Sequence, residues 1–588
     1  MTLPPLANLF AFSSPDRRLR GEVEADLIAA RSFAEVWRPH PQWVVAEAPL
    51  PESPPTVEAA RRAGLVFVEG RDRLISRARP EDDTAGLLDV LAAGPGRLAT
   101  LPGDFGLVHF RDDGSAVVVR SCAGRVPLYV WADGAEVAIA TLQRDLVAHL
   151  PGEIRIDPLS HATWMSCRGF TPDNRTFVAG ATIVPSGHRA VVAPAAPVRP
   201  ERYWDPRPER PVSSSARIVT DHAARLRELL VGNLALELDR GGRNLLSASG
   251  GVDSSAIGAL AAGPAGRPIN VAVSLVPRPG PKLEHEHSYI TPLLDHLNVA
   301  RRYEFGAYPG AIDGLQRDAS PSFFPKFHPV LCVLDRVVNE TGVLTYVGGE
   351  FCDDLFGAPV LHDWNVSAPP WQALARTGRD LHGRASLLRW CRDRAAGVLG
   401  WRLTDLPDRL PEPVNSELQA EYEQWRRGQR RYPTGAHRAR RNLMERFPCG
   451  VSWLEMNWEI SSSYGVRRVL PFVTRDMLEL AAACHPQEVL ADGPKTLLRR
   501  GLRDDVPHRN LYRPDKGAFL RGEPRPPRSS PTGFPSEAAA ILDKSWLARS
   551  RSCERSVAWA LLLLLRSLSE FGRQRSQRPG LSYSTEAT

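Results

Sequence analysis

The sequence has 588 residues, 43% of them hydrophobic, and therefore predicts a globular protein of two or more domains rather than one compact core. Its formal net charge of +7 is modest for this length and includes no dense basic block, so nucleic acid is not an expected partner. The eight cysteines contain no CxxC pair, which argues against a zinc site and a disulfide framework and favours a reducing, cytoplasmic compartment.

Residues 1–192 predict a β-rich domain. Short apolar runs alternate with turn residues, for example at 43–46, 65–68, 106–110 and 116–119, and this pattern is typical of a layered sandwich. Residues 193–215 contain repeated prolines and end in three serines. Since proline fixes φ and lacks a backbone N–H, this stretch is expected to be a linker.

Residues 216–588 predict a second domain in which helices and strands alternate. A helical leucine spacing from 216 to 239 precedes a strand that ends at residue 247. Further strands are expected at 269–276 and 342–347, with a helix beginning near residue 330. This alternation is typical of a doubly wound parallel sheet, which binds ligands at the carboxyl ends of its strands.

The first chemical motif is Ser249-Gly250-Gly251-Val252-Asp253-Ser254, directly after the apolar strand. Paired glycines allow a tight turn and the close approach of a ligand, and the N–H groups at the start of the next helix attract an anion. Asp253 is suited to hold the Mg²⁺ that accompanies a phosphate. The alternative is an ordinary glycine turn with a serine or aspartate helix cap.

The second motif, residues 348–357, reads Gly-Gly-Glu-Phe-Cys-Asp-Asp-Leu-Phe-Gly and follows the third predicted strand. Its glycines and acids therefore lie at a strand end, to which the first motif also points. We expect Asp353 to be the second Mg²⁺ ligand, with Asp354 as a weaker candidate and a plain helix cap as the alternative role for Asp353.

Residues 364–445 have a mostly helical pattern and are rich in arginine and tryptophan. Two explanations stay open for this insertion: solvated helix faces, or a platform for a peptide. Core helices are expected near 476–483 and 495–502, and a loop rich in proline, arginine and serine at 522–536. The apolar run at 558–565 is too short to span a membrane, and residues 1–20 contain no secretory signal.

These motifs resemble those of a known family. Residues 249–254 are similar to the pyrophosphatase loop of the N-type ATP pyrophosphatases, and residues 349–357 resemble the acidic stretch of the class B asparagine synthetases. Three landmarks of that family's glutaminase domain have counterparts here, at residues 101–106, 124–129 and 183–188, so the resemblance covers about residues 95–520. It implies a glutaminase-like, Ntn-type α+β sandwich followed by an ATP-pyrophosphatase synthetase domain that uses ATP and Mg²⁺.

Glutaminase members of the family attack glutamine with an N-terminal cysteine. This chain begins Met1-Thr2-Leu3-Pro4 and its first cysteine is Cys122, so we expect the glutaminase-like domain to be inactive. Thr2 is a chemical alternative as nucleophile, and the sequence around it shows no trace of the family's usual start. A synthetase joined to an inactive glutaminase half resembles two groups, the β-lactam synthetases and the lasso-peptide macrolactam cyclases.

We favour a lasso-peptide cyclase, because the insertion at 364–445 is basic and aromatic and the loop at 321–329 is bulky and apolar. Its substrate would be a ribosomal precursor peptide, whose Asp or Glu side chain is joined to the N-terminal amine. A leader peptidase and a leader-recognition protein are the expected partners, and Lys326 and His328 the candidate substrate-pocket residues. The alternatives are a β-lactam- or asparagine-synthetase-like enzyme acting on a small molecule and, third, an inactive nucleotide-binding scaffold.

The resemblance also implies roles for single residues. Glu350 is the expected base, Lys516 is expected to stabilise charge on the acyl oxygen and phosphate, and Asp253 and Asp353 are expected to hold Mg²⁺. The expected ATP- and pyrophosphate-binding residues are Leu246, Ser247, Ser249, Gly250, Gly251, Asp253, Ser254, Ser274, Gly348, Gly349 and Lys495.

Overall fold

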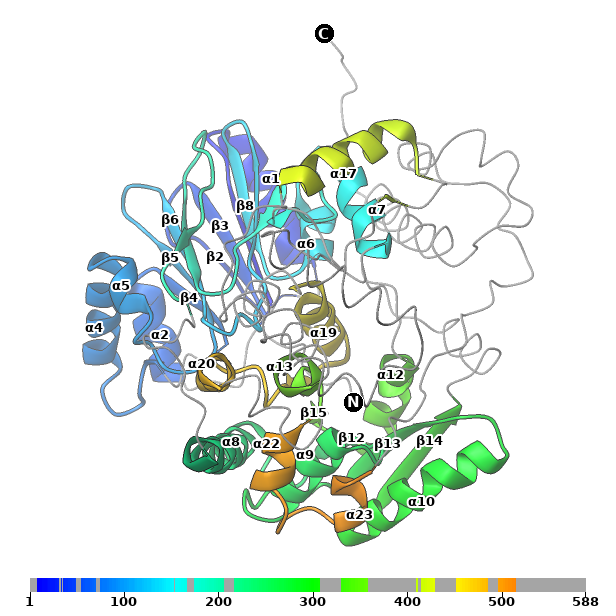
Figure 1. The fold of residues 1–588 in the computed structure, drawn as a ribbon. Helices are drawn as coiled ribbons and strands as arrows, with labels where there is room; N and C mark the ends of the chain where they lie inside the picture. Colours follow the sequence, from blue (N-terminus) through cyan, green and yellow to red (C-terminus); the bar gives the residue numbers. More distant parts are fainter. Residues whose placement is uncertain are drawn as a thin grey trace.

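Three sheets organise the computed structural model: two antiparallel sheets in the N-terminal part and one parallel sheet in the C-terminal part (Figure 1). The mixed α/β fold class expected from the sequence is therefore confirmed. The structure describes residues 8–30, 33, 35–48, 54–69, 74–152, 154–166, 174–205, 216–306, 329–357, 409–410, 414–428, 451–484 and 495–513. Outside these ranges lie Lys326, His328, Lys516, residues 1–7 and 558–565, and most of the insertion at 364–445.

The first sheet has the strand order β2-β3-β1-β8-β7-β9. Side chains alternate along β1, so Leu9 and Ala11 point to one face while Phe10 and Phe12 point to the other. Phe10 and Phe12 pack with helices on the outer face, mainly α1 and α6. The elements are β1 Leu9–Ser13, β2 Glu35–Trp37, β3 Trp43–Glu47, β7 Tyr129–Asp133, β8 Glu136–Ala140, β9 Ala181–Ile183, α1 Arg17–Ala29, α6 Gln143–His149 and α7 Pro158–Ser166.

The second sheet has the order β11-β10-β6-β5-β4 and packs face to face with the first. Val66 and Val118 meet Leu9 in the layer between the sheets, while Phe67 and Val119 pack outward against helix α4. The N-terminal part is thus a four-layer α/β/β/α sandwich. Its remaining elements are β4 Leu65–Glu69, β5 Gly106–Phe110, β6 Ala116–Arg120, β10 His188–Val192, β11 Glu201–Arg202, α2 Pro54–Arg62, α4 Pro80–Ala92 and α5 Pro95–Leu98.

Strand β11 lies inside the stretch that was expected to be a linker. Its residues Glu201 and Arg202 pair with Arg189 and His188 of β10, and the neighbouring Tyr203 is buried and donates its hydroxyl to the carbonyl of Arg120. Residues 206–215 lie outside the described part of the chain. The first part of the proline-rich stretch therefore belongs to the edge of the sandwich, where proline is tolerated.

The third sheet has five parallel strands in the order β14-β13-β12-β15-β16. Its strands are β12 Asn244–Ser247, β13 Val271–Val276, β14 Arg301–Gly306, β15 Thr345–Val347 and β16 Arg467–Val469. The helices of this part are α8 Ala216–Glu237, α9 Val252–Ala262, α10 Pro281–His296, α12 Pro329–Thr341, α13 Cys352–Phe356, α17 Ser416–Gly428, α19 Val451–Tyr464, α20 Arg475–Ala483, α22 Thr496–Gly501 and α23 His508–Leu511.

Helices cover both faces of this sheet. Leu246 of β12 faces α9 and α10, whereas the neighbouring Leu245 faces α12 and α19. The doubly wound arrangement predicted from the sequence is therefore present. Its strands β14 and β16 were not predicted, because they are edge strands with charged residues, and the acidic motif consequently follows the fourth strand of the sheet rather than the third.

The strand order places the two chemical motifs side by side. From β12 the chain continues to β13 and β14 on one side of the sheet, then crosses to β15 and β16 on the other. Strands β12 and β15 are neighbours, and the chain continues from them towards opposite sides of the sheet, which is where doubly wound proteins bind ligands. Residues 248–251 and 348–351 lie at this switch point.

Buried polar contacts join the sandwich to the third sheet. Arg125 Nε lies 2.5 Å from Asp104 Oδ2, and its Nη1 lies 2.6 Å from Glu237 Oε2 of α8. The hydroxyl of Tyr129 donates to Glu455 Oε2 of α19 at 2.7 Å. The two parts therefore share a desolvated polar interface.

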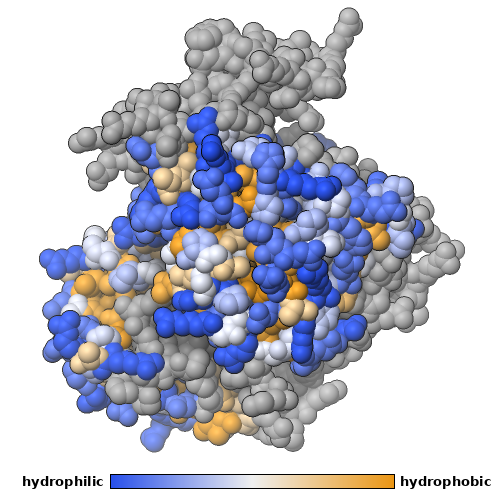
Figure 2. All heavy atoms as spheres, turned by 90° about the horizontal axis from the view of Figure 1, so that it is seen from below, coloured by the Kyte–Doolittle hydropathy of each residue, from blue (hydrophilic) through white to orange (hydrophobic). Residues whose placement is uncertain are grey.

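The face seen from below the third sheet is covered largely by hydrophilic residues, with hydrophobic areas between them (Figure 2). None of the helices in the described ranges is long and apolar enough to cross a membrane.

Candidate active site

A tight turn connects β12 to α9 and forms the floor of the site. Gly250 has φ 66°, the left-handed region that glycine tolerates best. A Cβ at Gly250 would lie 2.8 Å from Cβ of Tyr289, closer than side chains pack. Only glycine thus allows the turn to lie directly against α10.

Serine hydroxyls line this turn. The N–H of Ser249 donates to Ser254 Oγ at 3.2 Å, the two serine hydroxyls lie 3.0 Å apart, and the N–H of Gly251 donates to Ser249 Oγ at 3.3 Å. The first residue of α9 is Val252, and its N-cap Gly251 has no side chain with which to cap the helix. N–H groups and hydroxyls at this end of α9 are therefore arranged to bind an anion such as phosphate.

The acidic motif turns sharply after β15. Phe351 has φ 66° and precedes α13, which begins at Cys352 and carries Asp353 in its first turn. A Cβ at Gly349 would overlap Cβ of Asp253. The glycine therefore lets the turn lie against the start of α9, which brings Asp353 close to Asp253.

Lys495 connects these two carboxylates. Its ammonium forms an ion pair with Asp253 Oδ2 and lies 2.9 Å from Asp353 Oδ1, and its side chain is only 12% exposed. Lys495 precedes α22 and has φ 64°, an uncommon backbone conformation for a residue with a side chain. Three residues predicted from separate motifs thus meet at one point.

Burial and neighbouring charges shape the ionisation of this group. Burial raises the pKa of Asp253, and the ammonium of Lys495 opposes that rise. Burial also works against the charge of Lys495, but Cys352, Asp253 and Asp353 outweigh it and raise its pKa above the ordinary value. Lys495 is therefore a cation at neutral pH.

The carboxylates fit a magnesium ion. Asp253 Oδ1 is buried and has no hydrogen-bond partner in the described part of the chain, and carboxylate oxygens are the ligands that Mg²⁺ prefers. The described residues contain no group of three or more acidic, histidine or cysteine side chains arranged around one point. Such a sparse set suits Mg²⁺ that is bound by one or two carboxylates together with phosphate oxygens and water.

Glu350 lies in the same turn and has its own partner. Its carboxylate forms an ion pair with Arg468 of β16, a side chain that is only 5% exposed. The guanidinium carbon of Arg468 lies 3.6 Å from the ring centroid of Tyr346. The Glu350 side chain is 32% exposed, but its second carboxylate oxygen, Oε2, is buried and has no hydrogen-bond partner among the described residues.

The other predicted nucleotide-binding residues differ in how they are placed. Leu246 is fully buried and packs in the core beside α9, so its side chain is structural. Ser247 ends β12 and contacts the Tyr346 hydroxyl. Ser274 lies in the middle of β13, and its buried hydroxyl has no partner among the described residues. Gly348 accommodates the carboxylate of Glu350, which folds back over it.

Sequence reasoning missed a set of residues that hold the phosphate turn from behind. Asn510 of α23 donates to the carbonyls of Gly250 at 3.1 Å and Tyr289 at 3.0 Å. Arg513 donates to the carbonyl of Ser249 at 3.2 Å and to Glu286 at 2.8 Å. These partners are separated by more than two hundred residues, and no local pattern marks them.

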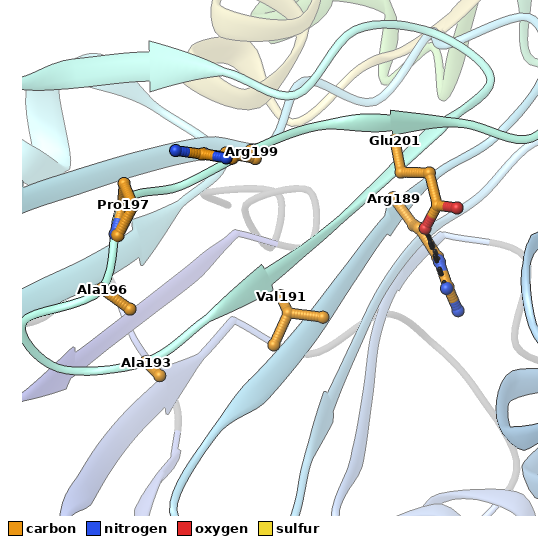
Figure 3. A pocket seen from close by; sticks show the side chains of 7 residues that line it. All are labelled: Arg189, Val191, Ala193, Ala196, Pro197, Arg199 and Glu201. Carbon is orange, nitrogen blue, oxygen red and sulfur yellow. Dashed lines mark hydrogen bonds and ion pairs between the residues drawn. The ribbon is translucent and has the colours of Figure 1, made fainter.

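A pocket of about 240 Å³ lies away from these residues, on the sandwich beside β10 and β11 (Figure 3). Its side chains include Val191, Pro197 and the ion pair of Arg189 with Glu201. The predicted residues Asp253, Asp353 and Lys495 meet elsewhere, at the switch point between β12 and β15, and this point is the candidate active site.

The asparagine synthase family model matches residues 225–562, which is more than half of the chain and includes Asp253, Glu350, Asp353 and Lys495. No curated protein matches the chain.

Proposed function

Because the chain belongs to the asparagine synthase family, we propose that it activates a carboxylate by transfer to the AMP part of ATP and then converts it to an amide. Family membership indicates ATP-dependent amide-bond formation. We propose in addition that the reaction releases AMP and pyrophosphate. The observation that supports it is the meeting of the phosphate turn with Asp253, Asp353 and Lys495.

In the first step a substrate carboxylate oxygen attacks the α-phosphorus of ATP, and the bond between that phosphorus and the pyrophosphate oxygen breaks. The serine hydroxyls of the turn and the amino-terminal end of α9 would receive the pyrophosphate. Mg²⁺, when bound, neutralises charge on the phosphate oxygens. Asp253 and Asp353 would hold it, and Lys495 adds a further positive charge.

In the second step an amine attacks the acyl-adenylate, and AMP leaves. We propose that Glu350 takes the proton from the amine, because it lies in the acidic turn and is oriented by Arg468. An α-amine has a reference pKa of roughly 7.7 to 8.0, so a weak base is enough. This assignment of Glu350 is a proposal from geometry.

Lys516 lies outside the described residues, so its role is proposed from the family resemblance. Arg513, the last described residue before it, is buried against Ser249 and Glu286. We assign to Lys516 the stabilisation of charge on the acyl oxygen and the phosphate.

The sandwich is proposed to be a glutaminase-like domain that hydrolyses no glutamine. The three free cysteines of the described ranges, Cys122, Cys352 and Cys484, are all buried. Burial raises the pKa of the Cys122 thiol to about 12, which makes it a poor nucleophile. The amine is therefore proposed to belong to the substrate rather than to come from glutamine.

For the substrate we propose a ribosomal precursor peptide that is closed into a lasso-type macrolactam. The support is the basic and aromatic composition of residues 364–445. Within its described part, α17 is attached to the sandwich by an ion pair of Glu421 with Arg175, at 2.7 Å. The alternative is a β-lactam- or asparagine-synthetase-like reaction on a small molecule, which the same adenylation chemistry would serve.

The experiment combines two assays. Exchange of labelled pyrophosphate into ATP, measured with candidate carboxylates, tests adenylation. Incubation with ATP, Mg²⁺ and leaderless synthetic peptides that have a free α-amine and an Asp or Glu residue tests cyclisation, which removes one water from the peptide mass. Turnover of free amino acids without dehydration of any peptide would favour the small-molecule alternative. Nucleotide binding without pyrophosphate exchange and without any product would identify an inactive nucleotide-binding scaffold.

A further inference from the structure

The ammonium of Lys495 lies where a cation between Asp253 and Asp353 would be bound. It contacts one carboxylate oxygen from α9 and one from α13, two helices that follow different strands of the sheet. The side chain of Lys495 is 12% exposed, that of Asp253 19% and that of Asp353 32%. Two carboxylates brought this close repel each other unless a positive charge lies between them.

An ordinary structural salt bridge is the simpler explanation of this contact. Two features argue for a further role. Lys495 has a left-handed backbone with φ 64°, and strain of this kind is concentrated at functional sites. Asp253 also keeps a buried oxygen, Oδ1, without a hydrogen-bond partner among the described residues.

We propose that Lys495 acts as a built-in substitute cation that keeps free divalent metal ions out of the site until a nucleotide is present. This inference rests on the proposed function, in which Asp253 and Asp353 hold the metal. The ammonium cancels the charge of one carboxylate and covers an oxygen of each. A free metal ion must therefore displace a paired lysine, which weakens its binding.

A metal ion that binds together with ATP competes less strongly with Lys495 for the two carboxylates. The phosphate oxygens offer Lys495 new partners, so its ammonium can leave the two carboxylates and pair with the phosphates instead. The carboxylates then become available as ligands. The consequence is an order of binding in which metal and nucleotide enter together.

The test uses Mn²⁺ as a probe, because its electron paramagnetic resonance signal weakens when the ion is bound. Without nucleotide, the unaltered protein is expected to bind Mn²⁺ weakly, and Lys495→Met is expected to bind it at least tenfold more tightly. Adding a non-hydrolysable ATP analogue is expected to remove most of this difference. Lys495→Arg keeps the positive charge and should behave like the unaltered protein.

Two controls keep the result specific. Lys282→Met removes an exposed lysine from α10 and should not change Mn²⁺ binding. Adding Asp253→Asn to Lys495→Met should abolish the gain. Equal Mn²⁺ affinity in the unaltered protein and a folded Lys495→Met variant, checked by circular dichroism, would overturn the inference. Pyrophosphate exchange by the unaltered protein reports separately on the proposed function, so the two failures are distinguishable.

Discussion

Arg468 and Glu350 form an ion pair that connects the edge strand β16 to the turn after β15. Arg468 is held in turn over the ring of Tyr346, whose pKa is raised to about 12 mainly by burial. This stacking restricts the motion of the Arg468 side chain, and the ion pair therefore fixes the orientation of the Glu350 carboxylate. A residue on the edge of the sheet thereby positions the proposed base at its centre.

Arg468→Met should separate the two proposed steps. Without its partner Glu350 loses its orientation, so amide formation should fall by about 10²-fold, the lower range for a general base, while pyrophosphate exchange changes little. Product formation and exchange, measured on the same protein, check this. Arg336→Met, which removes a 66%-exposed arginine of α12, is the control. An equal loss in both assays would show that Arg468 supports the whole site rather than Glu350.

Substitution of either central carboxylate should abolish adenylation. Asp253→Asn and Asp353→Asn each remove charge from the point where Lys495 and the proposed Mg²⁺ are held, so pyrophosphate exchange should fall by at least about 10²-fold. Asp504→Asn is the control, because Asp504 is 92% exposed and lies outside the proposed site. The double variant should be no worse than either single one, since the residues act as a unit. Full activity in Asp253→Asn would mean that the site is wrongly placed.

Gly250→Ala should cost more stability than a left-handed backbone alone explains. Gly250 and Gly266 have φ values of 66° and 60°, but a Cβ at Gly266 would meet no atom within 4 Å, whereas at Gly250 it would meet Tyr289. Gly266→Ala should therefore cost about 1 kcal/mol of unfolding free energy, the price of the left-handed conformation. Gly250→Ala should cost more and also weaken ATP binding. Urea unfolding and nucleotide titration measure both effects, and equal losses in the two variants would contradict the predicted overlap.

The buried Glu455 should make stability depend on pH. Burial raises the pKa of Glu455 from the usual value of about 4.5 to about 7. The Tyr129 hydroxyl and Arg120 oppose this rise. The folded protein therefore holds a proton that the unfolded chain releases, so the contribution of Glu455 is largest at acidic pH. It declines as pH rises from about 4.5 through about 7, in total by about 3 kcal/mol.

Glu455→Gln removes this titration while it keeps an acceptor for the Tyr129 hydroxyl. The free energy of unfolding, measured with urea, should then vary less between pH 5 and 8. At high pH the variant should be more stable relative to the unaltered protein than it is at low pH. A variant with the same pH profile as the unaltered protein would assign the dependence to other groups. Glu421→Gln, at an exposed position of α17, serves as the control.

The parts of the site that are formed by a few consecutive residues could be predicted from the sequence. The phosphate turn needs two glycines after a buried strand, and the acidic turn needs glycines and carboxylates at another strand end, so both are visible in short stretches. Alternating strand and helix patterns also predicted the doubly wound sheet and the layered sandwich. These features depend on backbone geometry and on apolar periodicity, which act over a few residues.

Contacts between distant residues were decided by the tertiary structure alone. The edge strands β14 and β16 carry charged residues, so no apolar pattern marked them, and without β16 the pairing of Arg468 with Glu350 could not be foreseen. Lys495 was expected near phosphate, but only the order of the strands brings it between Asp253 and Asp353. Asn510 and Arg513 reach the phosphate turn for the same reason. Such pairs form because folding closes long loops around one sheet, and a sequence read residue by residue contains no record of which loop ends will meet.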